Sequence, residues 1–227
     1  MLLKNRKTMK KFAIVLAGCG VYDGTEIHEA VMSLYAVVKN GAEYKLFAPD
    51  IAQHHVVNHL TGEEMPESRN VLVESARIAR GKIQELTELD LRDFDGLLFP
   101  GGFGVAKNLC SYAFKGADCE IHPQVSKIIR DALSLRKPIG ALCISPVLIA
   151  KILGDVTITV GPDEDDAVNV KNMGAKHIVT KPGDVIIDEK HRVFTTPCYQ
   201  LDSNIVQIAE GADNIVKEML KQMGFDE

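Results

Sequence analysis

The chain has 227 residues, of which 46% are hydrophobic and 25% charged, a composition that is typical of a globular domain and excludes global disorder. A net charge of −5 argues against nucleic-acid binding, and no apolar run reaches the roughly 20 residues of a membrane-spanning helix. The five cysteines are odd in number and form no C-x-x-C pair, which indicates reduced thiols and predicts a cytoplasmic location.

The N-terminus admits two interpretations. The basic start, the apolar run 12–17 and the following Gly18-Cys19 resemble a bacterial lipoprotein signal. The apolar run is shorter than the roughly 7 to 15 residues of a secretory signal, so a first β-strand followed by a glycine loop is favoured. Residues 1–8 are then predicted to be an extension, and residues 9–227 a single domain.

Apolar runs and helical periodicities alternate along the rest of the chain. This order predicts an α/β three-layer sandwich with a mostly parallel sheet and helices on both faces. The polar stretch 50–92 is predicted to be an insertion over the sheet edge. In the first helix, one apolar stripe is expected to face the core. It consists of Ile27, Ala30, Val31, Leu34 and Val38. Further strands are predicted at 44–48, 96–99, 139–143, 156–160, 177–180, 185–187 and 193–196, and helices at 25–39, 71–79, 125–133, 147–153 and 204–220.

Cys143 stands between a predicted strand and a predicted helix. Ser145 is the predicted N-cap, and Pro146 suits the first helical position. Such a tight turn lifts one side chain into the crevice at the carboxyl ends of the strands, as in the nucleophile elbow of hydrolases. The helix N-terminus should favour the thiolate, which is the nucleophilic form. We therefore predict a nucleophile, and the alternative is a small buried core residue.

A glycine-rich segment, Pro100-Gly101-Gly102-Phe103-Gly104, follows the strand 96–99. Successive backbone N–H groups in such a loop can bind an oxyanion, and a plain turn is the alternative. The segment lacks both the Walker A lysine and the G-x-G-x-x-G spacing. We predict no nucleotide or other cofactor.

The loop that enters the first helix contains several polar side chains. Asp23 and Glu26 have the spacing of a capping box, so capping is the first interpretation of Glu26. Glu29, one turn later, is the other candidate for a general acid/base in the crevice, and the helical wheel does not choose between the two. His28 is expected to face solvent, and Cys19 is a candidate second thiol near the site.

Two other polar groups give weaker signals. His55 and His59 lie four residues apart, but no third ligand accompanies them, so a solvated polar edge is favoured and no metal site is predicted. The acidic run 163–166 is predicted to cap the helix that follows it.

The Cys143 turn, the glycine loop and the early-helix glutamates together resemble the class I glutamine amidotransferase-like superfamily typified by the PfpI protease. Within it, longer segments resemble the ElbB (enhancing lycopene biosynthesis) proteins. These segments are 17–30, 47–50, 58–63, 69–78 and 100–109, and the likeness runs from about residue 9 to the C-terminus. The resemblance implies a flavodoxin-like fold and a homodimer.

The resemblance also implies the site residues. Cys143 is the implied reactive thiol. Superfamily members place a glutamate beside it, twelve residues before the glycine that ends the first helix, and counting back from Gly41 selects Glu29, with Glu26 in reserve. The glycine loop, at Gly101 and Gly102, and Ile144 are the implied oxyanion and substrate-binding positions, with the N–H groups of Gly102 and Ile144 as the oxyanion donors.

The histidine of the superfamily is not found. Protease-like members carry a histidine directly after the cysteine, where this chain has Ile144. The Thr-His-Pro segment of other members corresponds to residues 160–162, and neither His177 nor His191 begins the His-x-Glu of amidotransferases. Proteolysis and glutaminase activity are therefore disfavoured, because expelling an amine requires a general acid.

A cysteine–glutamate pair suits addition to an aldehyde, which needs no protonated leaving group. With the resemblance, it predicts a cofactor-independent glyoxalase III-type enzyme that converts 2-oxoaldehydes such as methylglyoxal or glyoxal to hydroxy acids. The resemblance further implies an association with isoprenoid biosynthesis. The alternatives are a thiol redox sensor, an interaction protein supporting isoprenoid metabolism and, less favoured, a cysteine hydrolase. The expected partners are a small aldehyde and a second copy of the chain, and neither nucleic acid nor a membrane is expected.

Overall fold

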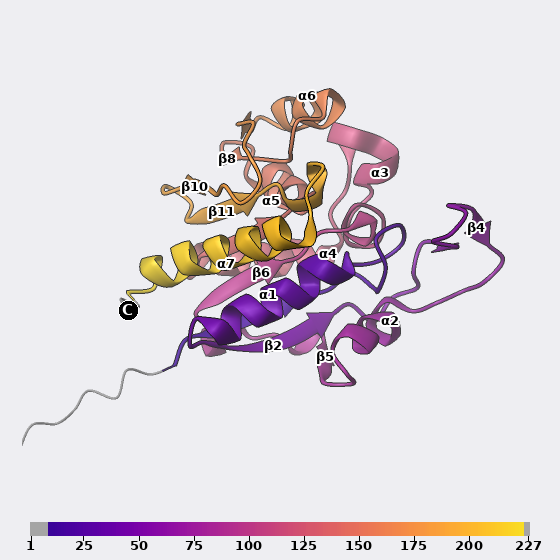
Figure 1. The fold of residues 1–227 in the computed structure, drawn as a ribbon, viewed down its shortest axis with the longest axis horizontal. Helices are drawn as coiled ribbons and strands as arrows, with labels where there is room; N and C mark the ends of the chain where they lie inside the picture. Colours follow the sequence, from indigo (N-terminus) through magenta and orange to yellow (C-terminus); the bar gives the residue numbers. More distant parts are fainter. Residues whose placement is uncertain (1–8, 225–227) are drawn as a thin grey trace, which may run out of the picture.

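The computed structural model describes residues 9–224, which are arranged around a seven-stranded sheet (Figure 1). The strand order is β10-β11-β7-β6-β1-β2-β5, and every neighbouring pair is parallel except β10 with β11. The strands are β1 (Lys11–Val15), β2 (Glu43–Ala48), β5 (Ile83–Glu85), β6 (Gly96–Phe99), β7 (Ile139–Leu142), β10 (Ile186–Asp188) and β11 (Val193–Thr196). The predicted first strand is confirmed. The proposed extension 1–8 lies outside the described residues.

Helices cover both faces of this sheet. Helices α1 and α7 lie side by side on one face (Figure 1). The connections β1–β2 and β6–β7 run in opposite directions along the sheet, so right-handed crossovers place α1 and α4 on opposite faces. The fold is therefore the predicted flavodoxin-like sandwich. The helices are α1 (Ile27–Lys39), α2 (Val71–Ile78), α3 (Tyr112–Lys115), α4 (Pro123–Ser134), α5 (Pro146–Leu153), α6 (Glu164–Asn172) and α7 (Ile205–Gln222), with single turns η1 (Leu86–Glu88), η2 (Leu91–Asp93), η4 (Gly116–Asp118) and η5 (Cys198–Gln200) and a π-helical turn η3 (Val105–Leu109).

The stretch 50–92 only partly matches the prediction of an insertion. Strands β3 (Val56–Val57) and β4 (Glu64–Met65) form a separate two-stranded sheet, as an insertion would. Strand β5, however, belongs to the main sheet and forms its edge beside β2. Its three residues, Ile-Gln-Glu, are too few and too polar to give a strand signal. The predicted strands near 157 and 177 form a second small sheet, β8 (Thr157–Ile158) with β9 (Lys176–His177).

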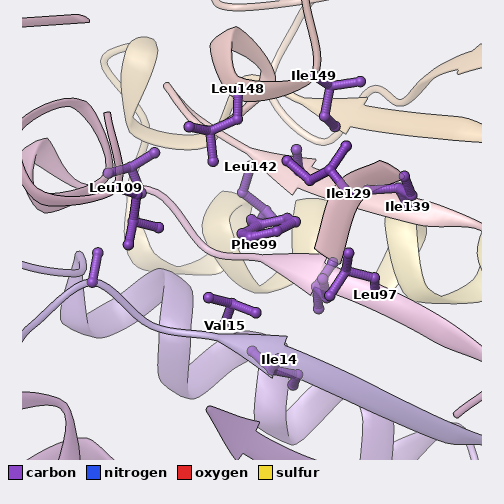
Figure 2. Packing of buried hydrophobic residues seen from close by; sticks show 14 of the residues in the cluster. Ile14, Val15, Leu97, Phe99, Leu109, Ile129, Ile139, Leu142, Leu148 and Ile149 are labelled. Carbon is purple, nitrogen blue, oxygen red and sulfur yellow. The ribbon is translucent and has the colours of Figure 1, made fainter. Parts of the chain in front are cut away.

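The core lies between the central strands and the helices that cover them. Figure 2 shows Ile14 and Val15 of β1, Leu97 and Phe99 of β6 and Ile139 of β7 packed together. Each is at most 1% exposed. Burying a side chain of this size contributes roughly 1.5–3 kcal/mol, so the central strands form a stable platform for the loops at their carboxyl ends. Within residues 9–224, no helix is both long and apolar enough to cross a membrane.

The buried face of α1 differs from the predicted stripe. Val31 and Val38 are 44% and 60% exposed, so the expected stripe does not face the core as a whole. The helix instead buries Glu29 and Ser33, together with Ala30, Ala36 and Val37. Because two residues of this buried face are polar, a search for an apolar stripe does not identify it. Glu29 consequently points toward the carboxyl ends of the central strands.

Candidate active site

Cys143 occupies a sharp turn between β7 and α5. Its φ is 59°, in the left-handed region that few residues other than glycine adopt. Its N–H donates to the carbonyl of Thr196, 2.9 Å away on the neighbouring strand, and this bond fixes the turn at the end of the sheet. Strained backbone of this kind is found at functional sites, where the surrounding structure maintains it. The residue as a whole is 9% exposed, which places the thiol at the floor of the crevice rather than on the surface.

Ser145 connects this turn to the glycine loop. It occupies the predicted N-cap position of α5, but its side chain makes no capping hydrogen bond, which contradicts the expected capping. Its buried hydroxyl instead donates to the carbonyl oxygen of Pro100 at 2.8 Å. The ends of β6 and β7 are thereby held together.

Glu29 lies directly against Cys143. Its carboxyl group is fully buried and is hydrogen-bonded to the cysteine thiol. Its Oε2 accepts from the N–H of Gly101 at 2.8 Å, and its Oε1 accepts from the N–H of Tyr199 at 3.4 Å. A Cβ at position 101 would lie 2.5 Å from the Cys143 Cβ and 2.6 Å from Oε2 of Glu29, so this contact requires glycine.

Glu26 has the capping role that was the first interpretation of it. Its Oε2 accepts from the N–H of Glu29 at 2.6 Å, at the start of α1. The expected capping box with Asp23 is wrong, because the buried carboxylate of Asp23 accepts instead from the N–H of Val57 in β3 at 2.8 Å. His28 is exposed, as expected, and its Nδ1 lies 2.9 Å from the hydroxyl of Tyr199.

The proton equilibria of the Cys143–Glu29 pair differ from the prediction. Burial, followed by the nearby Glu29 carboxylate, raises the pKa of Cys143 well above its ordinary value. Burial, followed by the Glu26 carboxylate, raises the pKa of Glu29 to about 8. The expectation of a thiolate favoured by the helix N-terminus is therefore wrong, because removal from water outweighs the helix end. At neutral pH the pair holds both protons in most molecules.

Two backbone donors converge on the cysteine sulfur. The N–H groups of Gly102 and Ile144 both hydrogen-bond to it and oppose the increase in its pKa. Gly102 has a φ of 103°, and a Cβ there would collide with the backbone of the α1 entry loop. The N–H of Gly101 is instead used by Glu29. The N–H groups of Gly102 and Ile144 therefore both point at the sulfur, and their predicted role as oxyanion donors stays a prediction.

A pocket of about 700 Å³ opens above the sulfur, and we call it the Cys143 pocket. Its lining is Val21, Glu26, His55, Gly102, Phe103, Ala106, Lys107, Tyr112, Ala113, Phe114, Gly116, Cys143, Ile144, Asp163, Asp166, Asn169, Tyr199 and Gln200. Tyr199, Lys107 and Asp166 were not recognised in the sequence as site residues. Asp166 belongs to the acidic run, where Asp163 caps α6 as predicted.

Other candidates from the sequence lie elsewhere. Cys19 does not line the Cys143 pocket. The charged groups that act most strongly on its thiol are Glu74 and Arg77 of α2, so Cys19 lies beside that helix. His55 Nε2 lies 3.1 Å from Nζ of Lys107, whereas His59 accepts from a backbone N–H at 3.2 Å, so the two histidines have different partners. Within residues 9–224, no three His, Cys, Asp or Glu side chains are grouped to hold a metal ion.

The fold and the cysteine turn are those of a class I glutamine amidotransferase-like domain. Solved structures agree. A protein of Ehrlichia chaffeensis described as an isoprenoid biosynthesis protein with an amidotransferase-like domain is 33% identical, with a TM-score of 0.87 over 93% of this chain and 99% of that one. DJ-1beta of Drosophila melanogaster shares the fold at 16% identity, with a TM-score of 0.54 over 96% and 100% of the two chains. No family model matches the chain.

Curated relatives place the chain more narrowly. It is 44% identical to the mitochondrial ES1 protein homolog of Rattus norvegicus and 43% identical to the human mitochondrial glutamine amidotransferase-like class 1 domain-containing protein 3. Each match covers 94% of this chain and 84% of the relative. The chain belongs to this ES1 family. The ES1 protein of Danio rerio, 34% identical over 92% of this chain and 84% of its own length, is also named mitochondrial. These names contradict the predicted cytoplasmic location.

Proposed function

We propose that this protein is a cofactor-independent glyoxalase III-type enzyme, which isomerises and hydrates 2-oxoaldehydes to 2-hydroxy acids. One observation carries the proposal. A buried thiol and a buried carboxyl group are in contact, two backbone N–H groups converge on the sulfur, and a pocket opens above it. This arrangement suits a carbonyl carbon bonded to sulfur whose oxygen is held by the two donors. Glu29 is placed to move the protons.

The first chemical step joins the sulfur to the aldehyde carbon. Ionised Glu29 accepts the thiol proton as Cys143 attacks, and the N–H groups of Gly102 and Ile144 stabilise the oxygen, which then takes that proton to give a hemithioacetal. The carboxylate next removes the hydrogen from the former aldehyde carbon, and the resulting enediolate carries its charge on the oxygen of the adjacent carbon. That oxygen takes the proton of the hydroxyl group on the former aldehyde carbon, and protonated Glu29 returns its proton to the adjacent carbon, which gives a thioester of the 2-hydroxy acid. Water cleaves this thioester, releasing the acid and restoring the thiol.

Among residues 9–224, no hydrogen bond joins a histidine to the Cys143 thiol, and this supports aldehyde chemistry over hydrolysis of amides. Among the described residues that line the Cys143 pocket, the histidine is His55, and its Nε2 is occupied by Lys107. Glu29 is then the acid/base in contact with Cys143. The raised pKa of the thiol also weighs against a redox sensor, because sensing cysteines are generally low-pKa, accessible thiolates.

A resemblance to the ElbB proteins, and with it an association with isoprenoid metabolism, remains part of this proposal. The Ehrlichia chaffeensis relative, which aligns over 93% of this chain, is named an isoprenoid biosynthesis protein.

The test is lactate formation from methylglyoxal in the absence of glutathione. We expect wild-type protein to be active and Cys143→Ser and Glu29→Gln to be inactive. Cys19→Ser is the matched control, because it also removes one thiol but lies outside the pocket, and it should retain activity. Lactate formation that survives in Cys143→Ser at the wild-type rate would refute the proposal.

A further inference from the structure

The Cys143 pocket is larger than the simplest 2-oxoaldehydes require. Its volume of about 700 Å³ lies within the roughly 300–1,000 Å³ of sites that enclose drug-sized ligands. Methylglyoxal carries only a methyl group beyond its two carbonyls and would leave most of this space to water. Exposed Phe103 and Phe114 lie on the lining and offer apolar surface to a longer substrate. The pocket therefore indicates a substrate that extends well beyond the reacting carbons.

A half-buried ammonium group lies in the wall of this pocket. Lys107 comes from η3, the π-helical turn that follows the glycine loop. Its Nζ donates to the carbonyl oxygen of Tyr22 at 2.7 Å and lies 3.1 Å from Nε2 of His55 and 5.0 Å from the centre of the Phe103 ring. The backbone carbonyl and the imidazole hold the amine at a fixed place. An ammonium has three N–H donors, so one is left for a ligand.

The charge of Lys107 is only partly compensated by the carboxylates around it, because those of Asp23 and Glu64 act on it without pairing with it. Among residues 9–224, no carboxylate forms an ion pair with it. Burial, followed by Lys107 itself, lowers the pKa of His55, so this ring is a neutral acceptor. Burial also lowers the pKa of Lys107, because the ammonium group loses part of its hydration when the protein folds. A negatively charged ligand group would compensate for that loss.

The other charges of the pocket would orient such a ligand. Among the described lining residues, Lys107 is the cation, whereas Glu26, Asp163 and Asp166 are acidic. Asp163 and Asp166 belong to the start of α6 rather than to η3. An anionic group is attracted to Lys107 and repelled by the carboxylates, so a substrate with one anionic end has one favoured orientation.

We propose that Lys107 forms a carboxylate-binding subsite of the Cys143 pocket, so that the preferred substrate is a 2-oxoaldehyde whose far end carries a carboxylate. This inference rests on the proposed function for the nature of the reacting end. The anionic end is inferred from the charge and position of Lys107, and a carboxylate is the anion that the experiment tests. Methylglyoxal is then a poor substrate because it lacks the anionic group.

The experiment compares 4,5-dioxopentanoate with its methyl ester, which differ in the charge of the far end. The product of the acid is 2-hydroxyglutarate. For wild type, we expect kcat/KM to be about 10- to 100-fold higher for the acid, mainly through KM, as for one charge-assisted hydrogen bond. Lys107→Met should lower kcat/KM about 10- to 100-fold more for the acid than for the methyl ester, and Lys107→Arg should restore most of the preference for the acid. Lys82→Met, at an exposed lysine outside the pocket, is the matched control.

A second measurement separates this inference from the proposed function. Binding of 4-oxopentanoate, which has the carboxylate but no aldehyde, is measured by NMR titration on Cys143→Ser with and without Lys107→Met. Binding that weakens about tenfold or more without the lysine supports the subsite even if no aldehyde is turned over. Equal binding in both proteins, or an equal loss of turnover for the acid and the ester, would assign Lys107 a structural role and overturn the inference.

Discussion

Replacing Glu29 with glutamine is expected to make the protein more stable above neutral pH while it abolishes turnover. Glu29 is fully buried, and its pKa is about 8 in the folded protein instead of the ordinary 4.5. Between these values the unfolded chain has lost the proton and the folded chain retains it. The free energy of unfolding of the wild type therefore falls as the pH rises through this window. The shift corresponds to on the order of 5 kcal/mol across the whole window.

The glutamine variant does not titrate at this position, so its curve lacks this fall. Glutamine keeps one oxygen to accept from the N–H of Gly101, but its amide nitrogen cannot accept from Tyr199. This mismatch offsets part of the gain, by roughly 1–3 kcal/mol. The change with pH is therefore the quantity to measure. We expect the stability of the variant relative to wild type to rise by on the order of 3 kcal/mol from pH 5 to pH 8.

Urea denaturation of both proteins at several pH values between 5 and 8 measures this change. Glu63→Gln, which removes an exposed carboxylate far along the chain, corrects for the general effect of altering the net charge. Stability curves of Glu29→Gln and wild type that run parallel across the window would refute the argument. They would mean that Glu29 is ionised throughout and that its burial is compensated by its hydrogen bonds.

Three further outcomes follow from the same contacts. Gly101→Ala should reduce kcat at least tenfold, because the new Cβ would displace both the Glu29 carboxyl group and the Cys143 side chain. A folded variant with the wild-type kcat would show that position 101 has room for a side chain. Ser145→Ala should lower the free energy of unfolding by about 1–3 kcal/mol, since it leaves the buried carbonyl of Pro100 without its donor, and an unchanged urea midpoint would contradict this. Under the proposed mechanism, kcat/KM for methylglyoxal should rise tenfold per pH unit below about 8 and level above it, as Glu29 ionises; a flat profile between pH 6 and 8 would exclude Glu29 as the base.

Much of the architecture could be predicted from local pattern. The strands at the centre of the sheet are continuous apolar runs because helices cover both faces, and they are recognisable for that reason. The turn at Cys143 was also readable, since a strand, a cysteine and a proline at the first helical position follow one another directly. Edge strand β5 was missed because it is short and polar.

The site itself was only partly accessible to such reasoning. A helical wheel assumes that the buried face is apolar, whereas α1 buries Glu29 and Ser33. The protonation of Cys143 depends on how deeply the thiol is buried. The spacing of residues in the sequence does not give this depth. Lys107 gave no signal either, because its position in the pocket depends on contacts with residues 22 and 55.

The way in which Glu29 is held bears on how this family diverges. Both carboxyl oxygens accept from main-chain N–H groups, those of Gly101 and Tyr199. Every amino acid except proline supplies such a donor, so position 199 can change its side chain over evolution without releasing the acid/base. Position 101 has no such freedom, because the space beside it is filled. We therefore expect relatives to vary at position 199 and to keep glycine at position 101. A change of residue at position 199 does not show that the Glu29 carboxyl group has lost its hydrogen bond.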